Sequence, residues 1–394
     1  MKKIIFSMFF LIMVVVSFGY KYIFLFVGDG MGMNHLTIAN SYKLYNYNES
    51  LNIFNLENLS FMNTVSLNGV TDSAASITAM LSFEKTYNDR INIDKEDRKL
   101  SPITFYLKDL RYKIGLISTA TIVDPTIAAA FTRINQRREY QSISKQLSES
   151  NVDLVISGGR AFVETNDNFL FSNNFLNEIS NSNEIITLYY SNFPFLLDSQ
   201  NRVTLNEMLK YTLEKFKKQN FFIIIEGARI DHASHAKDTH SMIKEILDLD
   251  EAVKTALEFY NKYPEDTLII VTADHETGGL SLGDGFIRIS SISNQKYSYE
   301  SLASVFLNSE NYEDFISKTN IDFDLRKEYY LTEKKSPVSY TSSLIKAYLS
   351  YYNDHSGIGW TTHGHTMNYV PVFSVGYKYP PLIDNTELLL HLIK

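Results

Sequence analysis

The chain has 394 residues, of which 44% are hydrophobic and 21% are charged, which predicts one large globular domain or a core domain with an insertion. Its formal net charge of −8 argues against duplex nucleic acid as a main partner, because proteins that bind a duplex usually present a basic face. Cysteine is absent, so disulfides are excluded and any zinc must be held by His, Asp or Glu.

Residues 1–19 are typical of a secretory signal. Two lysines precede a short apolar run that ends with Ser17 and Gly19, small residues at positions −3 and −1 of a cleavage site. A membrane anchor is the alternative, because apolar sequence resumes at Tyr22, although the run is short for a span. We expect cleavage, which leaves a domain over 20–394 in the periplasm or outside the cell, with no stable membrane span.

Six short apolar runs are predicted to be buried strands, and segments with helical spacing lie between them. The strands are Tyr22–Val27, Lys113–Ser118, Leu154–Ser157, Phe221–Ile225, Leu268–Thr272 and Val370–Val375, and examples of the helices are Ser142–Ser150, Leu205–Gln219 and Met242–Tyr263. This alternation indicates an α/β fold, a three-layer sandwich with a largely parallel central sheet flanked by helices. Because ligands bind at the carboxyl ends of parallel strands, functional groups are expected directly after these runs.

The segment Thr71–Ser76 opens a pattern of helical spacing after a turn-rich stretch. A helix that begins at Ser73 would place this hydroxyl at a helix N-terminus, where free backbone N–H groups and the helix dipole favour an anion. The alternative is an ordinary Asp or Ser N-cap without a catalytic role. Ser73 is therefore a candidate nucleophile.

The segment Glu226–His235 directly follows the strand Phe221–Ile225. Asp231 and His235 stand four residues apart, so on a helix they share one face and can bind the same metal ion. Gly227 permits an unusual backbone turn after the strand. The alternative is an exposed polar start of a helix.

Two further segments combine carboxylate and imidazole groups, which are ligands suited to zinc. Asp274 and His275 follow the strand Leu268–Thr272 directly. His363 and His365 flank a glycine shortly before the last predicted strand, and either could be the ligand.

Together with Asp29 after the first strand, these ligands outnumber what one metal ion needs. Two metal ions about 4 Å apart can clamp the attacking and leaving oxygens of phosphoryl transfer. His and Asp suit zinc, and a Thr hydroxyl with Asp and Glu suits magnesium. An acidic protein that binds phosphate also needs a guanidinium group, and the sequence alone does not choose among Arg133, Arg137 and Arg138.

Five motifs in order resemble those of the alkaline phosphatase family, namely Phe26–Gly32, Thr71–Ala75, Glu226–His235, Thr272–His275 and Gly364–Thr366. The resemblance runs from about Tyr22 to Tyr377 and implies an alkaline phosphatase-like catalytic domain over 20–394. It is weakest across Ser281–Ser356, where the periodicity degrades into Ser-, Asn- and Tyr-rich sequence, and this loss of pattern predicts a small cap insertion at about 281–356. It also implies a phosphomonoesterase that acts on small-molecule phosphate monoesters, and the possibility of a homodimer.

The family pattern implies a role for each matching residue. Ser73 would be the nucleophile that becomes phosphorylated, and it would also contact the second of two zinc ions. The first zinc ion would be held by Asp231, His235 and His365. The second would be held by Asp29, Asp274 and His275, and a magnesium ion by Asp29, Thr126 and Glu226.

Arg137 matches the phosphate-binding arginine of the family, because it lies eleven residues after Thr126, the implied magnesium ligand. Ile127 stands where the family often has proline. Two positions vary within the family, the one beside the first zinc ligand, here His232, and one near the magnesium site, here Asp124. Metal preference and pH optimum therefore stay open.

Two alternative functions fit the same residues. One is a phosphodiesterase or a sulfatase-type hydrolase of the same superfamily, although the absence of cysteine excludes a cysteine-derived sulfatase nucleophile. The other is an exported protein that binds phosphate or metal without turnover, for which Ser73 would have no use. The sequence does not identify the natural substrate.

Overall fold

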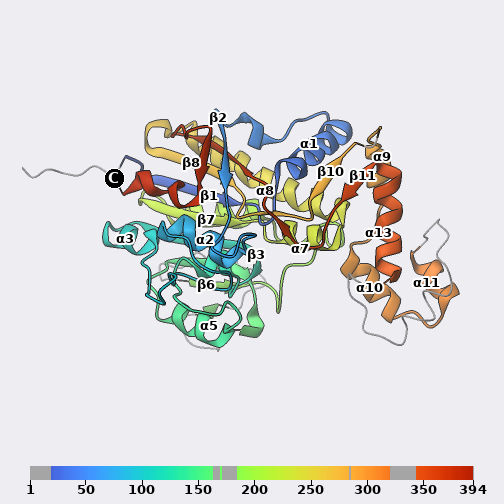
Figure 1. Ribbon diagram of the computed structural model, residues 1–394, viewed down its shortest axis with the longest axis horizontal. Helices are drawn as coiled ribbons and strands as arrows, with labels where there is room; N and C mark the ends of the chain where they lie inside the picture. Colours follow the sequence, from blue (N-terminus) through green and yellow to red (C-terminus); the bar gives the residue numbers. More distant parts are fainter. Residues whose placement is uncertain (1–18, 163–168, 171–183, 284, 320–342, 394) are drawn as a thin grey trace, which may run out of the picture.

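The computed structural model describes residues 19–162, 169–170, 184–283, 285–319 and 343–393 (Figure 1). Its centre is a ten-stranded sheet in the order β14-β2-β13-β8-β1-β7-β3-β4-β6-β5. Within this sheet only β13 runs antiparallel to its neighbours, β2 and β8. The strands are β1 (Tyr22–Val27), β2 (Asn58–Asn63), β3 (Lys113–Thr121), β4 (Leu154–Gly158), β5 (Phe169–Leu170), β6 (Glu184–Thr187), β7 (Phe221–Glu226), β8 (Thr267–Thr272), β13 (Val370–Val375) and β14 (Leu382–Asp384).

Helices flank the sheet, which confirms the predicted fold class of a largely parallel sheet between helices. Helices α6 and α8 pack on strands β1, β3 and β8, and α3 and α4 pack on β3 and β7. The helices of the main body are α1 (Met33–Tyr47), α2 (Ser73–Ser82), α3 (Ile103–Asp109), α4 (Pro125–Ala128), α5 (Tyr140–Ser148), α6 (Leu205–Lys215), α7 (Arg229–Ala236) and α8 (Thr239–Tyr260). Two short antiparallel pairs lie apart from the main sheet, β9 (Glu276–Thr277) with β12 (His365–Thr366) and β10 (Leu280–Leu282) with β11 (Ile358–Trp360).

The six predicted strands are all present, but all three predicted helices have different ends. Helix α5 spans Tyr140–Ser148 and not Ser142–Ser150, and α8 ends at Tyr260 and not at Tyr263. Helix α6 ends at Lys215, not at Gln219, because Phe216 already leaves the helical conformation and Lys218 has a positive φ of 64°. Helix α8 begins at Thr239, three residues before the predicted Met242, because the Asp238 side chain caps it by accepting from the backbone N–H of Ser241.

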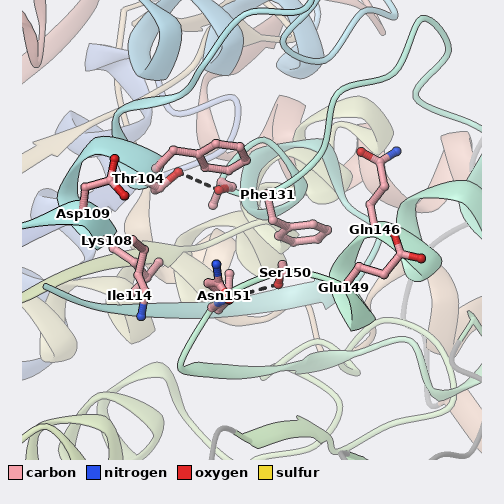
Figure 2. Close-up of a pocket in the computed structure, with 12 residues that line it drawn as sticks. Thr104, Lys108, Asp109, Ile114, Phe131, Gln146, Glu149, Ser150 and Asn151 are labelled. Carbon is pink, nitrogen blue, oxygen red and sulfur yellow. Dashed lines mark hydrogen bonds between the residues drawn. The ribbon is translucent and has the colours of Figure 1, made fainter. Parts of the chain in front are cut away.

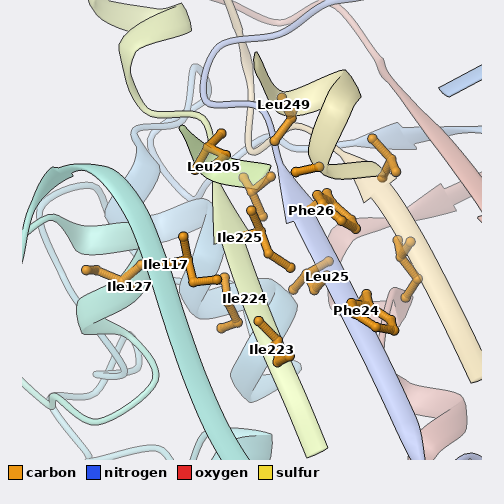
Figure 3. Packing of buried hydrophobic residues seen from close by; sticks show 14 of the residues in the cluster. Phe24, Leu25, Phe26, Ile117, Ile127, Leu205, Ile223, Ile224, Ile225 and Leu249 are labelled. Carbon is orange, nitrogen blue, oxygen red and sulfur yellow. The ribbon is translucent and has the colours of Figure 1, made fainter. Parts of the chain in front are cut away.

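The core is centred on the parallel strands β1, β7 and β8. Figure 3 shows Phe24–Phe26 of β1 beside Ile223–Ile225 of β7, with Ile117 of β3 on the other side of β7. Each of these side chains is buried, and fully burying a side chain of this size contributes roughly 1.5–3 kcal/mol. Strands buried on both faces are continuous apolar runs, and this is why they could be recognised in the sequence.

Four helices, which we call the accessory helices, lie together at one end of the molecule in Figure 1, away from α3 and α5. They are α9 (Ile289–Ser293), α10 (Tyr299–Leu307), α11 (Tyr312–Thr319) and α13 (Ser343–Ser356). They hold an apolar cluster of their own, which includes Leu302, Phe306 and Phe315. These helices fall in the stretch 281–356, and its interpretation as a cap insertion stays a prediction.

The predicted secretory signal, 1–19, falls almost wholly outside the described residues. Within the described ranges, no helix combines the length and the apolar character that a membrane span requires.

Candidate active site

Ser73 is the first residue of α2, as the sequence predicts. The N-cap is the preceding residue, Asp72, whose side chain accepts from the backbone N–H of Ala75 at 2.9 Å. Asp72 therefore performs the capping role, and the Ser73 hydroxyl is available for another contact. The Ser73 Oγ is only 3.2 Å from Nε2 of His275, which lies 202 residues later in the sequence.

The first predicted metal group is brought together by α7 and β12. One ligand atom each of Asp231, His235 and His365 lies within 4.8 Å of the others. The two imidazole Nε2 atoms are 3.2 Å apart, and that of His235 is also 3.2 Å from Oδ2 of Asp231. On the opposite side of each ring, Nδ1 faces a backbone carbonyl, that of Thr71 for His365 and that of His363 for His235. Donation by Nδ1–H to those carbonyls leaves both Nε2 atoms as acceptors that can bind a cation.

Of the two C-terminal histidines, His365 is the one that lies in the first group, because the pairing of β12 with β9 sets it opposite Thr277. His363 lies behind the site, where its Nδ1 is 2.7 Å from the backbone carbonyl of His235. The turn that follows β9 requires Gly278, which has a φ of +88° and where a Cβ atom would lie 2.4 Å from the ring of Trp360.

The second predicted group lies where β1 and β8 end side by side, with Val27 opposite Thr272. Asp29 and Asp274 follow these strands, and Nε2 of His275 is 3.5 Å from Asp29 Oδ1 and 3.2 Å from Asp274 Oδ2. Those two carboxylate oxygens are buried without a hydrogen-bond donor. Buried polar atoms are rarely left without a partner, so these two oxygens fit a cation-binding site.

The third group consists of Asp29, Asp124 and Glu226, again within 4.8 Å of one another. Asp124 caps α4, and the structure places its carboxylate within the group, whereas the sequence analysis set it near the site as a variable position. Thr126, the predicted magnesium ligand, follows in α4, and its Oγ1 is buried without a partner, as is Oε1 of Glu226.

The charges of the site are unbalanced. Burial raises the pKa of Asp29 well above its ordinary value, and the neighbouring Asp274 raises it further. Burial likewise raises the pKa of Glu226 well above its ordinary value, with Asp124 adding to the effect. A cluster of buried carboxylates in this state favours bound cations.

In the first group, by contrast, the carboxylate of Asp231 and the imidazole of His235 stabilise each other's charged forms. Burial alone would raise the pKa of Asp231, but the neighbouring His235 holds it well below its ordinary value. Burial lowers the pKa of His235, but Asp231 outweighs it and raises that pKa to about 9. The donor sets fit the predicted metals: mixed imidazole and carboxylate in the first two groups suits zinc, and oxygen alone in the third suits magnesium.

Of the three candidate arginines, only Arg137 lies beside the nucleophile helix. Its Nη1 is 3.2 Å from Oδ2 of Asp72, the residue before Ser73. Arg133 instead donates to the backbone carbonyl of Leu100 and covers the ring of Phe105. Arg138 is exposed to solvent.

Sequence reasoning missed Thr277, whose hydroxyl donates to Asp231 Oδ1 at 2.6 Å. This contact holds one oxygen of a predicted zinc ligand. Thr277 lies two residues after His275 in the same motif, and this closeness was the available signal. The same contact requires a glycine at position 30, because a Cβ atom on Gly30 would lie 2.8 Å from both Asp231 Oδ1 and Thr277 Oγ1.

Two clefts on the surface lie away from these groups. One, of about 410 Å³, lies between α3, β3 and α5, where Thr104, Lys108, Phe131 and Glu149 line it (Figure 2). The other, of about 620 Å³, is lined by residues of α1, α6 and α8. Neither cleft contains any residue of the three ligand groups, so the chemistry of the side chains, not a hollow, identifies the site.

A model of the alkaline phosphatase family matches residues 20–169 and 162–389 of the chain. Alkaline phosphatase 4 of Bacillus subtilis (strain 168) is 26% identical over 394 residues, which cover 92% of this chain and 85% of the relative. The repressible alkaline phosphatase of Saccharomyces cerevisiae is 26% identical over 443 residues, which cover 91% and 76%.

Solved structures show the same fold. The cold-active alkaline phosphatase of a psychrophilic Shewanella sp. has a TM-score of 0.84 and 24% identity, and covers 94% of this chain and 98% of its own. A mutant of the alkaline phosphatase of the Antarctic bacterium TAB5, with Mg bound in its M3 site, has a TM-score of 0.70 and 22% identity, and covers 95% and 97%.

Proposed function

The chain belongs to the alkaline phosphatase family and is therefore a phosphatase, and we propose that it is exported and releases inorganic phosphate from phosphate monoesters through a phosphoserine on Ser73. The observation that carries this proposal is the contact of Ser73 Oγ with His275, a member of the second of three ligand groups. The second and third groups contain buried oxygens without a hydrogen-bond partner. We further propose two zinc ions, in the first and second groups, and one magnesium ion in the third. When bound, the metal ions would supply positive charge to the attacking, leaving and non-bridging oxygens.

The chain's own residues orient the reaction. Ser73 at the start of α2 presents its oxygen to the phosphorus of the monoester, and backbone N–H groups of the first helical turn favour the anionic phosphoryl group. Arg137, held by Asp72, offers a guanidinium that can donate to two phosphoryl oxygens at once. The Ser73 hydroxyl loses its proton as its oxygen forms a bond to phosphorus, the bond between phosphorus and the alcohol oxygen breaks, and that oxygen takes up a proton as the alcohol leaves.

In the second step, a water molecule attacks the phosphoserine, the bond between Ser73 Oγ and phosphorus breaks, and inorganic phosphate leaves. Thr277 and the backbone carbonyls behind His235 and His365 keep the ligand side chains in place through both steps. Preorganised charge of this kind is usually the largest single contribution to catalysis.

The test is hydrolysis of p-nitrophenyl phosphate at alkaline pH by the purified chain, before and after treatment with a chelator. We expect activity to disappear with the metal ions and to return when zinc and magnesium are both added. Bis-p-nitrophenyl phosphate serves as the matched diester. A preference for the diester would favour the phosphodiesterase alternative, and a burst of one phosphate per chain without turnover would favour the binding protein.

Export and self-association are proposals of the same kind. The signal-like segment 1–19 supports export, and the N-terminal residue of the protein recovered from the periplasm or medium tests it; we expect Tyr20. A homodimer is proposed from the family resemblance, and light scattering of the metal-loaded protein measures it.

A further inference from the structure

Arg229 is an almost completely buried arginine in the helix that carries two proposed zinc ligands. Its side chain is 1% exposed, and its guanidinium lies over the ring of Phe195 at 3.7 Å from the ring centroid. It is not a ligand of any of the three groups, and the proposed mechanism does not use it. A buried cation is costly unless it is paired, so its partners show what holds it there.

The two side-chain partners of Arg229 belong to different helices. Nη1 is 2.8 Å from Nδ1 of His232, which follows the proposed ligand Asp231 in α7. Nη2 donates to Oε2 of Glu300 at 2.6 Å, and Glu300 lies in the first turn of α10, one of the accessory helices. One side chain thus connects the accessory helices to the residue beside the metal site.

The contact with Arg229 fixes the form of the His232 imidazole. A guanidinium only donates hydrogen bonds, so Nδ1 of His232 must be the acceptor, and the ring hydrogen lies on Nε2. His232 can therefore offer only an N–H donor, the group that a phosphate oxygen accepts. It lies three residues from His235 on α7, and so on a neighbouring part of the same helix face.

Glu300 is itself held in place. The backbone N–H of the preceding Tyr299 donates to Asp238 at 2.9 Å, and Ser298, the N-cap of α10, donates through its backbone N–H to Asp198 at 3.0 Å. These contacts attach the first turn of α10 to the main body. The position of Glu300 relative to α7 is therefore set by packing and not by the ion pair alone.

We propose that Arg229 and Glu300 are positioning residues, which hold the imidazole of His232 as a hydrogen-bond donor for a phosphate oxygen and so make the accessory helices part of phosphate recognition. This proposal rests on the proposed function, because it assumes that phosphate binds at the three ligand groups. Helix α10 would thus contribute to phosphate affinity although none of its residues is a proposed metal ligand.

The test is a double-mutant cycle on the zinc- and magnesium-loaded protein, with inorganic phosphate affinity measured by calorimetry and KM and kcat measured with p-nitrophenyl phosphate. Glu300→Ala is expected to weaken phosphate binding and raise KM by about three- to tenfold, with kcat within about twofold. In a His232→Ala background, the same substitution should change phosphate affinity by less than about twofold, because its route of action has been removed. Glu300→Gln keeps an oxygen that accepts from Arg229, and should restore most of the affinity.

Glu310→Ala is the matched control, because it removes an exposed carboxylate between α10 and α11, and phosphate affinity should not change. A folded Glu300→Ala protein with wild-type phosphate affinity overturns the proposal, even if it melts earlier, because the contact would then be structural only. An equal loss of affinity in the His232→Ala background also overturns it. Phosphate binding without hydrolysis would refute the proposed function, while the calorimetric cycle would still decide this inference.

Discussion

Two regions of the molecule bury several carboxylates each, and they differ in what surrounds the oxygen atoms. The first, which we call the site carboxylates, lies at the carboxyl ends of β1, β7 and β8 and consists of Asp29, Glu226 and Asp274. The second, the α8 carboxylates, lies along and just before α8 and consists of Asp238, Glu245, Asp248 and Asp250. All seven side chains are at most 5% exposed.

The α8 carboxylates have a donor for every oxygen. Arg202 donates to both Glu245 and Asp248, at 2.6 and 2.9 Å, and Lys43 donates to Asp250 at 2.8 Å. The other oxygens accept from the donors of nearby residues, which are Leu196, Leu205, Ile53, Asn52, Ser241, Gln295 and Tyr299.

Each site carboxylate, by contrast, has one buried oxygen without a hydrogen-bond partner. Among the residues that the structure describes, no lysine or arginine forms an ion pair with these three side chains. Since an unpaired buried charge is costly, such a cluster is retained only if something from outside completes it. The two regions are equally buried but differ in their partners: the α8 carboxylates are paired within the fold, whereas the site carboxylates are suited to binding cations.

The largest effect is expected from Ser73, the proposed nucleophile. Ser73→Ala should lower the hydrolysis rate of p-nitrophenyl phosphate by more than about a thousandfold, because it removes the atom that becomes phosphorylated. The melting temperature and the bound zinc should stay close to those of the wild type. Ser82→Ala, at the other end of α2, is the control that should retain activity. Near-normal turnover by Ser73→Ala would show that the nucleophile is another group.

The opposite outcome is expected in the α8 region. Arg202→Met leaves Glu245 and Asp248 buried without their shared cation, and should lower the free energy of unfolding by about 3–5 kcal/mol. Activity per folded molecule should be unchanged. Lys217→Met removes an exposed ion pair with Glu214 and should cost less than about 1 kcal/mol in the same denaturant titration. An equally small cost for Arg202→Met would remove the distinction between the two regions.

The residues that the structure brings together in the candidate site were easier to anticipate from the sequence than the edges of the sheet. Ser73, Asp274 and their neighbours follow apolar strands or open a helix, so local patterns locate them. The edge strand β2 carries Asn and Ser among its apolar residues, and β14 has only three residues. Neither gives the continuous apolar run that marks a strand buried on both faces.

Contacts that depend on distant parts of the chain were not predictable. Asp124 enters the third ligand group because β3 continues to Thr121, past an irregular register against β4. Arg229 meets Glu300 across 71 residues of sequence. No spacing rule connects such pairs, because their distance is set by how the sheet and the accessory helices pack.

A smaller effect tests the site carboxylates through stability instead of activity. Asp274→Asn keeps an oxygen that can accept from the backbone N–H groups of Gly30 and His275 but removes the buried charge. Burial and the charge of Asp231 raise the pKa of Asp274 to about 6, so ionisation costs stability above that pH. At pH 8, without metal ions, the variant should be about 1–3 kcal/mol more stable than the wild type.

In the presence of zinc, the wild type should be more stable than the variant, because the wild type gains stability from bound metal and the variant lacks one of the ligands. Thermal melting with and without zinc measures both halves. A variant that is less stable than the wild type in both conditions would mean that Asp274 is paired in the fold and does not await a cation.

The smallest effect concerns Asp238, the α8 carboxylate whose partners are all neutral donors. Burial raises its pKa to about 6, although it accepts from Ser241, Gln295 and Tyr299. The pKa is higher in the folded chain than the ordinary value of about 3.9, so the folded state binds more protons between these values. The stability that protonation supplies is complete below pH 4 and is lost as the pH rises through 6.

The free energy of unfolding of the wild type, relative to that of Asp238→Asn, should therefore fall by about 1–3 kcal/mol between pH 4 and pH 7. Urea titrations of both metal-free proteins across this range measure the difference, because the site carboxylates titrate equally in the two and cancel. A difference that rises with pH would mean that the hydrogen bonds to Asp238 stabilise the carboxylate more than burial penalises it. In that case, hydrogen bonds from neutral donors alone would stabilise the ionised carboxylate of Asp238, and no cation would be needed to keep it charged.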